Sequence, residues 1–339
     1  MISSLLITLL TQITIYFLFN FLRKKISFDK YEAIQKIHEG EIPRIGGLIF
    51  FIGFITLLIL NKINLFLILP LLCSSLFIFS FSFYEDVKQN LSPIFRLIIL
   101  SIGSFIFVFF TNLPEINISF LLVINDHYYF LVLIFILSLM LIMNGFNFID
   151  GLNGLSSFSF FSILLSIYYV ANFYGDYFLT SLIIIIFLSS LVVFFLNFPF
   201  GKIFLGDSGS YLYAMISGSL VIYLFSRNPE LPSLLAMVIL AYPITEMLFS
   251  VFRKFFKGNS PLKPDTIHLH HLIFNRLDGN KFSRNNIASL MMLPFCILPF
   301  GLSYFSINYN LDNNFLKYLI FFLLYSMIYI FLSKSKINT

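Results

Sequence analysis

The chain reads Asn144-Gly-Phe-Asn147-Phe-Ile-Asp150-Gly151-Leu-Asn153-Gly154-Leu155 between two long apolar runs, residues 127–143 and 154–171. Each run has about the length that an α-helix needs to cross a bilayer. Amides and a carboxylate at such a place are costly, and they usually serve function. The structural alternative is a tight loop in which Asp150 or Asn153 caps the following helix. The stretch predicts two membrane helices joined by a polar, functional turn.

The composition is that of a polytopic membrane protein. Of the 339 residues, 59% are hydrophobic and only 11% are charged, and the mean hydropathy is +0.93. Soluble domains are far more polar. We therefore expect one all-α transmembrane domain over residues 1–339, embedded in a lipid bilayer. Cys73 and Cys296 lie inside apolar runs, so neither a disulfide nor a zinc site is expected.

Eleven apolar runs are long enough to be membrane helices. The first run is followed by a basic cluster rather than preceded by one, so it is expected to be a retained span and not a cleaved signal peptide. Two of the runs, 154–171 and 209–226, are diluted by Ser and Gly, which suit close helix packing. The eleven are residues 3–22, 45–61, 64–84, 94–111, 127–143, 154–171, 177–196, 209–226, 232–251, 285–306 and 314–333.

Basic residues predict the orientation in the membrane. Lys62, Arg227 and Lys317 lie in loops on one side of the membrane. The other 18 of the 21 Lys and Arg residues lie on the opposite side, which includes the C-terminal tail. Because basic loops stay in the cytoplasm, we expect the N-terminus outside and the C-terminus inside a plasma (inner) membrane. The loops expected to be cytoplasmic are 23–44, 85–96, 144–153, 197–210 and 252–284.

Polar clusters occur only in these loops. A transporter usually carries polar groups near the middle of its spans, whereas the middles of these runs hold almost no charge. The first loop ends in Pro43-Arg44-Ile-Gly46-Gly47, which can present backbone N–H groups and a guanidinium to a phosphate. The alternative is a helix start with a snorkelling arginine.

The second loop begins with two adjacent carboxylates, Glu85 and Asp86, followed by Lys88. Neighbouring carboxylates raise one another's pKa unless a metal or a basic group neutralises them. The pair is therefore a candidate for metal binding or proton transfer, and the alternative is a hydrated acidic helix end. In loop 197–210, Asp207 lies in Gly206-Asp-Ser-Gly209 before an apolar run. A helix N-terminus with a carboxylate suits Mg²⁺ and phosphate.

The longest loop, 252–284, is basic and contains His268-Leu-His270-His271. Phosphate binding or proton transfer by these histidines is favoured over a histidine–zinc site, because no cysteine lies nearby. The alternative is a basic loop lying on anionic lipid. The five loops together predict one cytoplasmic site with carboxylates for Mg²⁺ and basic groups for a pyrophosphate. A nucleotide diphosphate meeting a lipid phosphate would need all of these.

Taken together, the motifs resemble those of the polyprenyl-phosphate N-acetylhexosamine-1-phosphate transferases. They extend from Pro43-Arg44-x-Gly46-Gly47 to His268-x-His270-His271. The resemblance covers almost the whole chain. It implies transfer of a sugar-1-phosphate from a UDP-N-acetylhexosamine to a polyprenyl phosphate, with release of UMP and a requirement for Mg²⁺ or Mn²⁺. The histidine segment is more similar to the branch that initiates O-antigen synthesis. A lipid I-forming translocase is the alternative within the family, and a transporter of an anionic or lipid-linked solute is the alternative outside it.

The resemblance also implies roles for individual residues. Asp207 would be the metal ligand, joined by Asn147. Glu85, Asp86 and Asp150 would be the catalytic carboxylates, with the acidic pair acting on the lipid phosphate. The family usually has Asp where this chain has Glu85, which makes Asp86 the stronger catalytic candidate. A homodimer is compatible with the family, and nucleic acid is not an expected partner. The residues expected to bind substrate are Arg44, Gly46, Gly47, Lys88, Asn153, His268, His270 and His271.

Overall fold

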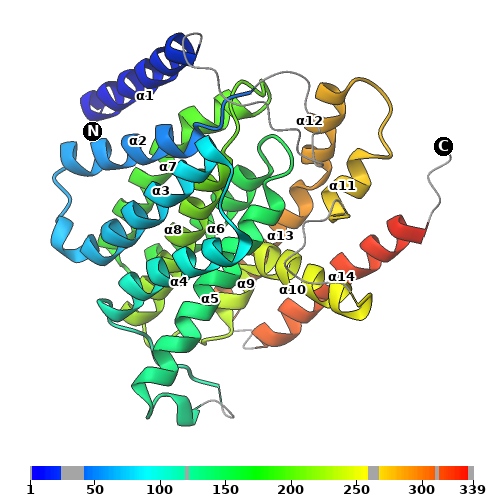
Figure 1. Cartoon of the computed structure of the whole chain (residues 1–339). Coiled ribbons are helices and arrows are strands. Elements are labelled where there is room, and N and C mark those ends of the chain that lie inside the picture. The colour runs from blue at the N-terminus through cyan, green and yellow to red at the C-terminus, as the bar shows by residue number, and fades with distance from the viewer. Residues whose placement is uncertain (1, 24–41, 119–121, 259–266, 310–312, 335–339) are drawn as a thin grey trace.

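The described residues fold into α-helices in a computed structural model that places residues 2–23, 42–118, 122–258, 267–309 and 313–334 (Figure 1). Within these ranges the only β contact is an isolated parallel bridge between Arg44 and Phe204. The all-α class expected from the sequence is confirmed. Eight helical segments in the same ranges are long and apolar enough to cross a membrane, so the chain is a multi-pass membrane protein.

The helices coincide with the predicted apolar runs, although their number is not the same. Run 232–251 is divided between two helices, and α2 and α4 are shorter than the other apolar helices. The count of eleven spans and the orientation therefore stay predictions. The helices are α1 (Ile2–Arg23), α2 (Gly46–Leu60), α3 (Leu69–Lys88), α4 (Pro93–Phe109), α5 (Tyr128–Ile149), α6 (Leu155–Phe173), α7 (Tyr177–Asn197), α8 (Gly206–Arg227), α9 (Leu235–Ile239), α10 (Ala241–Phe256), α11 (Leu269–Phe274), α12 (Lys281–Met291), α13 (Leu293–Asn308) and α14 (Asn314–Lys334), with short 3₁₀ turns at Leu65–Ile68 and Leu122–Ile124.

Two boundaries differ from the predicted ones, and both bring polar residues into helices. Helix α5 continues to Ile149, so Asn144 and Asn147 lie on its last turns and not in a 144–153 loop. Helix α8 begins at Gly206, three residues before the predicted run, and Asp207 lies in its first turn. A prediction from hydropathy places the end of a helix where polar residues begin. In the structure, the helix continues as long as its backbone hydrogen bonds are made.

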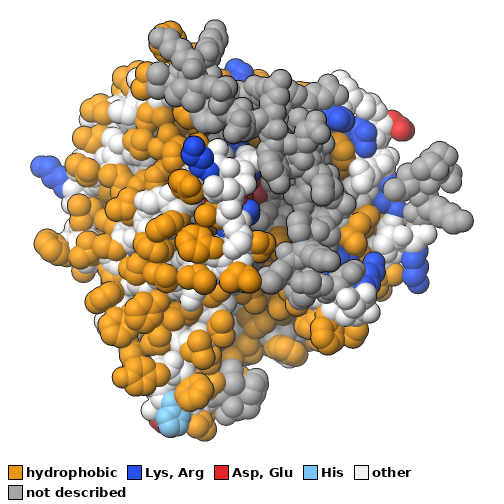
Figure 2. Space-filling view, viewed as in Figure 1, with side chains coloured by type: hydrophobic (Ala, Val, Ile, Leu, Met, Phe, Trp, Pro, Cys, Tyr) orange, Lys and Arg blue, Asp and Glu red, His pale blue; other side chains and the backbone are white. Residues whose placement is uncertain are grey.

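Helices that carry basic residues lie at one end of the molecule. Helices α11 and α12 and the end of α14 lie together at the upper right of Figure 1. Most of the Lys and Arg side chains visible in Figure 2 lie over the upper and right parts of that face, while hydrophobic side chains cover the rest. The starts of α2 and α8 are bonded to each other, because Gly46 N–H donates to Phe204 O at 3.0 Å and Gly47 N–H donates to Leu205 O at 3.0 Å.

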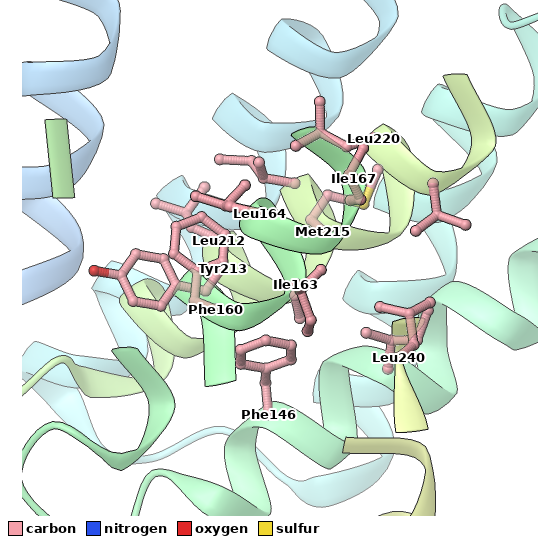
Figure 3. Packing of buried hydrophobic residues seen from close by; sticks show 14 of the residues in the cluster. Phe146, Phe160, Ile163, Leu164, Ile167, Leu212, Tyr213, Met215, Leu220 and Leu240 are labelled. Carbon is pink, nitrogen blue, oxygen red and sulfur yellow. The ribbon is translucent and has the colours of Figure 1, made fainter. Parts of the chain in front are cut away.

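Helix α8 is the central helix of the bundle. It packs against α2, α3, α5 and α6, and its whole apolar stretch is buried. Small residues allow this close packing: a Cβ on Gly218 would lie 2.4 Å from the Leu139 side chain of α5. The ring of Tyr213 stacks on Phe160 of α6 with centroids 4.0 Å apart (Figure 3). This packing fixes the position of the first turn of α8.

Helix α1 lies at the edge of the bundle and is the least buried long helix, with 17% of its apolar stretch covered. Two polar side chains connect it to the rest, Ser4, whose Oγ donates to Asn61 Oδ1 at 3.3 Å, and Gln12. Gln12 is fully buried, and its Nε2 donates to Ile49 O of α2 at 3.0 Å and to Ser189 O of α7 at 2.8 Å. Gly53 leaves room for this amide, since a Cβ there would lie 1.9 Å from Gln12 Nε2. An unpaired amide in apolar surroundings is costly, so these bonds hold α1 in place.

Candidate active site

Asp86 holds the first turn of α8. Its Oδ1 accepts from Asp207 N at 2.8 Å, and its Oδ2 accepts from Ser208 N at 2.9 Å and from Ser208 Oγ at 2.5 Å. The carboxylate therefore caps a helix 121 residues further along the chain, where unpaired N–H groups and the helix dipole both favour an anion. Gly206 has φ +76° and lies against this carboxylate, which a Cβ there would meet at 2.6 Å. The close approach requires glycine.

Glu85 and Arg96 form a second connection to Asp207. Glu85 Oε2 accepts from Asn90 N at 3.1 Å and from Leu91 N at 2.8 Å, which closes the turn after α3. Glu85 Oε1 accepts from Arg96 Nη2 at 2.6 Å, and Arg96 Nη1 donates to Asp207 Oδ2 at 3.2 Å. The guanidinium thus bridges two carboxylates from α3 and α8 and reduces their mutual repulsion.

Asp207 and Asn147, the two residues expected to bind the metal, lie side by side. Asn147 Nδ2 lies 3.2 Å from Asp207 Oδ1, at the end of α5 and the start of α8, and the Asp207 side chain is 17% exposed. Among the described residues, no three His, Cys, Asp or Glu side chains are grouped closely enough to hold a metal by themselves. Mg²⁺ usually takes only one or two carboxylates and completes its shell with water and substrate phosphates. Asp207 would supply the carboxylate of such a site. The Asn147 amide now donates from Nδ2 to Asp207 Oδ1, and it would offer its oxygen to a metal in the flipped orientation.

The Pro43–Gly47 segment lies beside the start of α8. Arg44 pairs with Phe204 in the isolated bridge, and its side chain is half-buried. A Cβ on Gly46 would lie 2.7 Å from Leu205 Cα, and one on Gly47 would lie 2.3 Å from Ser208 Oγ. The two glycines therefore let the α2 backbone pack directly on α8. A substrate-binding role for their N–H groups stays a prediction, since Phe204 O and Leu205 O already accept from them.

Asp150 ends α5 and is half-buried. Its Oδ1 accepts from Ser156 Oγ at 2.9 Å. Burial raises the pKa of the Asp150 carboxyl well above its ordinary value, and the charges of Asp207 and Asp86 raise it further, while the Ser156 hydrogen bond and the Arg44 charge lower it. The four charged residues are therefore close enough to influence one another, as expected for a single site.

The turn after Asp150 is fixed by asparagines. Asn153 N–H donates to Asn285 Oδ1 at 2.8 Å, and Gly154 N–H donates to Asn197 Oδ1 at 2.6 Å. The Asn153 side chain is 1% exposed, and neither its Oδ1 nor its Nδ2 has a hydrogen-bond partner among the described residues. A buried amide without partners is costly and calls for an explanation. A bound ligand that pairs with this amide would supply one, in agreement with the substrate role expected of Asn153.

The histidine segment packs onto this turn. His270 is fully buried, and a Cβ on Gly151 would lie 2.4 Å from its Nε2. Neither ring nitrogen of His270 has a hydrogen-bond partner within the described residues. Burial lowers the pKa of His270 well below its ordinary value, and the charges of His271 and His268 lower it further, so the ring is neutral at pH 7.

A buried carboxylate on α10 supports the segment. Glu246 Oε1 lies 2.8 Å from His268 Nδ1, and its Oε2 accepts from Tyr325 OH of α14 at 2.7 Å. The His268 ring also packs on Phe148 of α5 with centroids 5.1 Å apart. Glu246 is not among the residues predicted from the sequence, because the middles of the apolar runs hold almost no charge. A single carboxylate with a tyrosine and a histidine far away in sequence leaves no local pattern.

Most predicted site residues come together around the start of α8 and the end of α5. Lys88 differs from them, since its side chain is exposed in the last turn of α3. Arg96 was inside a predicted loop but had no assigned role, although it bridges two site carboxylates. The basic residues of 24–41 and the segment 259–266, both parts of predicted site loops, lie outside the described residues.

Comparison with known proteins gives a consistent result. The model of glycosyl transferase family 4 matches residues 68–225, which include Glu85, Asp86, Asp150 and Asp207. The undecaprenyl-phosphate alpha-N-acetylglucosaminyl 1-phosphate transferase of Thermotoga maritima is 30% identical over 260 residues, which cover 76% of this chain and 76% of that protein.

Two further relatives have similar names. The protein of that name from Salmonella typhi is 28% identical over 299 residues, covering 79% of this chain and 77% of its own length. A probable undecaprenyl-phosphate N-acetylglucosaminyl 1-phosphate transferase of Bacillus subtilis is 27% identical over 271 residues, covering 79% and 75%. These relatives are transferases, so the transporter alternative gains no support from them.

Proposed function

Because the chain belongs to glycosyl transferase family 4, we propose that it transfers an N-acetylhexosamine-1-phosphate from a UDP-sugar to a polyprenyl phosphate such as undecaprenyl phosphate. Membership of the family makes it a membrane-embedded transferase. One observation carries the proposal. The first turn of the buried helix α8 presents Asp207 beside Asn147 and Arg96 at the end of the bundle where the polar loops meet.

The reaction forms one P–O bond and breaks another. An oxygen of the lipid phosphate attacks the β-phosphorus of the UDP-sugar, and the bridging oxygen leaves with UMP. The products are a polyprenyl diphosphate sugar and UMP, so phosphorus and charge balance without a further reactant. Such transfers depend mainly on positioning and on charge stabilisation of the phosphoryl oxygens.

Asp207 and Asn147 would hold Mg²⁺ or Mn²⁺, which when bound supplies charge neutralisation of the pyrophosphate. The start of α8 adds the positive end of its dipole near the same anion. Arg44 and the histidines at 268, 270 and 271 would contact phosphates and sugar, and Lys88 would attract the nucleotide. The buried amide of Asn153 would pair with a polar edge of the UDP-sugar.

One of the three candidate carboxylates would accept any proton that remains on the lipid phosphate, whose second pKa is about 6. Asp86 accepts three hydrogen bonds and Glu85 accepts three, whereas Asp150 accepts one, from Ser156. Asp150 also has a pKa raised by burial, which makes it a better base than an ordinary aspartate. The role expected of Asp86 on the lipid phosphate stays a prediction, and the hydrogen bonding favours Asp150 for the proton.

The biological setting follows from the substrates. An enzyme that makes a lipid-linked sugar diphosphate initiates a cell-envelope glycan, here an O-antigen-like polysaccharide, at the cytoplasmic face of the plasma (inner) membrane. The histidine segment favours this role over the formation of lipid I.

The test is direct transfer by the purified protein. It is incubated with undecaprenyl phosphate, Mg²⁺ and a panel of UDP-sugars that are labelled in the sugar and, separately, in the β-phosphate. We expect both labels to enter the lipid fraction with release of UMP, for UDP-N-acetylglucosamine or a close relative. Transfer of the sugar without the phosphate, with release of UDP, would contradict the proposal, and so would the absence of transfer from every donor. An Asp207→Asn protein is the matched inactive control.

A further inference from the structure

Glu246 is a buried carboxylate that the proposed reaction leaves without a role. It lies on the second turn of α10 and is 1% exposed. Its Oε1 lies 2.8 Å from His268 Nδ1, and its Oε2 accepts from Tyr325 OH at 2.7 Å, so each oxygen has a specific partner. A carboxylate buried among apolar helices is costly, and it is usually retained because it serves a function.

The contact with Glu246 fixes where the His268 ring carries a proton. An ionised carboxylate can only accept hydrogen bonds, so the short contact requires a proton on His268 Nδ1. The Tyr325 hydroxyl occupies the other oxygen and keeps the carboxylate from turning away. A ring that donates from Nδ1 to Glu246 can donate from Nε2 to a phosphate only as the imidazolium. A cation at such a buried place needs a counter-charge, which this carboxylate supplies.

The backbone directly before His268 is fixed as well. Helices α10 and α14 lie side by side (Figure 1), and each contributes a side chain to the carbonyl of Ile267. Arg253 donates from Nη1 to Ile267 O at 2.6 Å and to Tyr329 OH at 3.0 Å, and Tyr329 OH donates to the same carbonyl at 2.9 Å. The two helices therefore hold both the ring of His268 and the chain that leads to it.

This support is attached to the end of α5, where the site residues lie. The His268 ring packs on Phe148 with centroids 5.1 Å apart, and Phe148 directly follows Asn147. Helix α10 packs with its backbone against α5, since a Cβ on Gly145 would lie 2.3 Å from Pro243 O. The position of the carboxylate is thus fixed relative to the helix end that carries the site.

We propose that Glu246 is a positioning residue for the donor substrate and that it acts through His268. Tyr325 holds the carboxylate, and the carboxylate orients the histidine and balances its charge while the ring binds a phosphate oxygen of the UDP-sugar. The assignment rests on the proposed function and adds the residue on which the histidine depends. Because Glu246 is buried and both of its oxygens are used, its effect on the substrate must pass through His268.

The test is a double-mutant cycle on the binding of UDP-N-acetylglucosamine to the full-length protein in nanodiscs with Mg²⁺. Glu246→Gln keeps the size of the side chain and removes its charge, so we expect Kd to rise about tenfold or more, the value of a charge-assisted hydrogen bond. His268→Gln should raise Kd by at least as much. Adding Glu246→Gln to His268→Gln should then change Kd by less than about twofold, because the residue through which it acts is already gone.

Two further variants separate positioning from stability alone. Glu246→Asp keeps the charge but has a shorter reach, so an intermediate Kd is expected. Tyr325→Phe removes only the hydroxyl on Oε2 and should raise Kd by a smaller factor than Glu246→Gln. In protein labelled with ¹⁵N-histidine, the Nδ1 signal of His268 is assigned by its loss in His268→Gln. It should shift in the two Glu246 variants and in Tyr325→Phe.

Asp176→Asn is the matched control. Asp176 is also an almost fully buried carboxylate, it accepts from Arg227 at 2.5 and 2.9 Å, and it caps α7 at the opposite end of α6 from the site. We expect a lower melting temperature, with Kd and the His268 signal unchanged. Melting temperatures of all variants identify any that do not fold. If Glu246→Gln is one of them, Tyr325→Phe with and without His268→Gln decides the outcome.

A rise in Kd that is as large in the His268→Gln background as in wild type would overturn the assignment. Wild-type Kd in both Glu246→Gln and Tyr325→Phe would overturn it as well. The transfer assay separates this failure from that of the proposed function. An enzyme that transfers sugar phosphate to undecaprenyl phosphate, with additive effects of the two substitutions, would refute the positioning role alone. A protein that shows the coupling in Kd but transfers nothing to any lipid would refute the reaction and retain the role of Glu246 in donor binding.

Discussion

At the scale of single residues, Asp207 is the side chain on which the proposed chemistry depends. It is held by donors from α4 and α5 and is partly exposed. Asp207→Asn keeps the shape and removes the charge, so we expect the rate to fall about 100-fold or more, with partial recovery as Mg²⁺ or Mn²⁺ is raised. Initial rates against metal concentration check this. A normal rate with normal metal dependence would remove Asp207 from the metal site.

The burial of His270 leads to a prediction about how the stability of the protein depends on pH. Its pKa is lowered by burial, so the folded protein binds fewer protons at this residue than the unfolded chain does. Its contribution to stability is therefore present above the unfolded pKa of about 6.5 and is lost as the pH falls below it, by up to about 1.4 kcal/mol per pH unit. We expect the melting temperature to fall less steeply between pH 7 and 5 in His270→Gln than in wild type. Parallel profiles would show that His270 is not held neutral.

At the scale of elements, the acidic pair joins α3 to α8. Asp86→Asn keeps the size of the side chain but places an amide against N–H groups that need an acceptor. We expect a loss of roughly 2 kcal/mol in stability together with a loss of activity. Thermal unfolding and transfer rates are measured on the same preparation. Lost activity at an unchanged melting temperature would instead return Asp86 to the proton-transfer role that the sequence suggested.

The contact between α2 and α8 makes a second prediction for elements. In an open helix, Gly→Ala stabilises by about 1 kcal/mol. At Gly47 the added Cβ would lie 2.5 Å from Gly209 N, which is backbone and cannot move aside, so Gly47→Ala should lower the melting temperature. Gly301 of α13 is the matched control, because nothing lies within 4 Å of a Cβ there. Similar melting temperatures for both variants would contradict the packing role of Gly47.

The positions of the helices and the residues that form the site were predictable to different extents. Long apolar runs identified the helices, because burial in lipid or in the bundle requires them. Motifs at 44, 86, 150 and 207 were expected to meet, since one reaction needs their chemistry together. The role of each of these residues was not predictable from the sequence. Whether Asp86 faces a substrate or caps a helix depends on the distance between α3 and α8, which no local pattern reports.

Single polar residues whose partners are distant in sequence were not predicted. Glu246 is one carboxylate in a mostly apolar segment, and its meaning comes only from His268 and Tyr325, which are 22 and 79 residues away. Gln12 and Asn197 are similar cases. A single polar residue in an apolar run has many explanations until its neighbours are placed.

At the scale of the whole molecule, the distribution of basic residues predicts a cytoplasmic C-terminus. The 18 Lys and Arg residues of the expected cytoplasmic side outnumber the three on the other, and such an asymmetry normally fixes orientation. A C-terminal fluorescent protein that matures only in the cytoplasm should be bright, and a C-terminal phosphatase that is active only outside should be inactive. The opposite pattern would mean that the number of spans is even or that the orientation is inverted.

The two bonds of Gln12 have a consequence for the order of assembly. Its partners are 37 and 177 residues further along the chain. At translation rates of about 5–20 residues per second, the second partner is made roughly 10–35 s after the first helix has entered the bilayer. During that interval the amide of Gln12 lacks its bond to Ser189 O, and α1 can still move along its neighbours. Helix α1 therefore completes these contacts only after α7 has been synthesised.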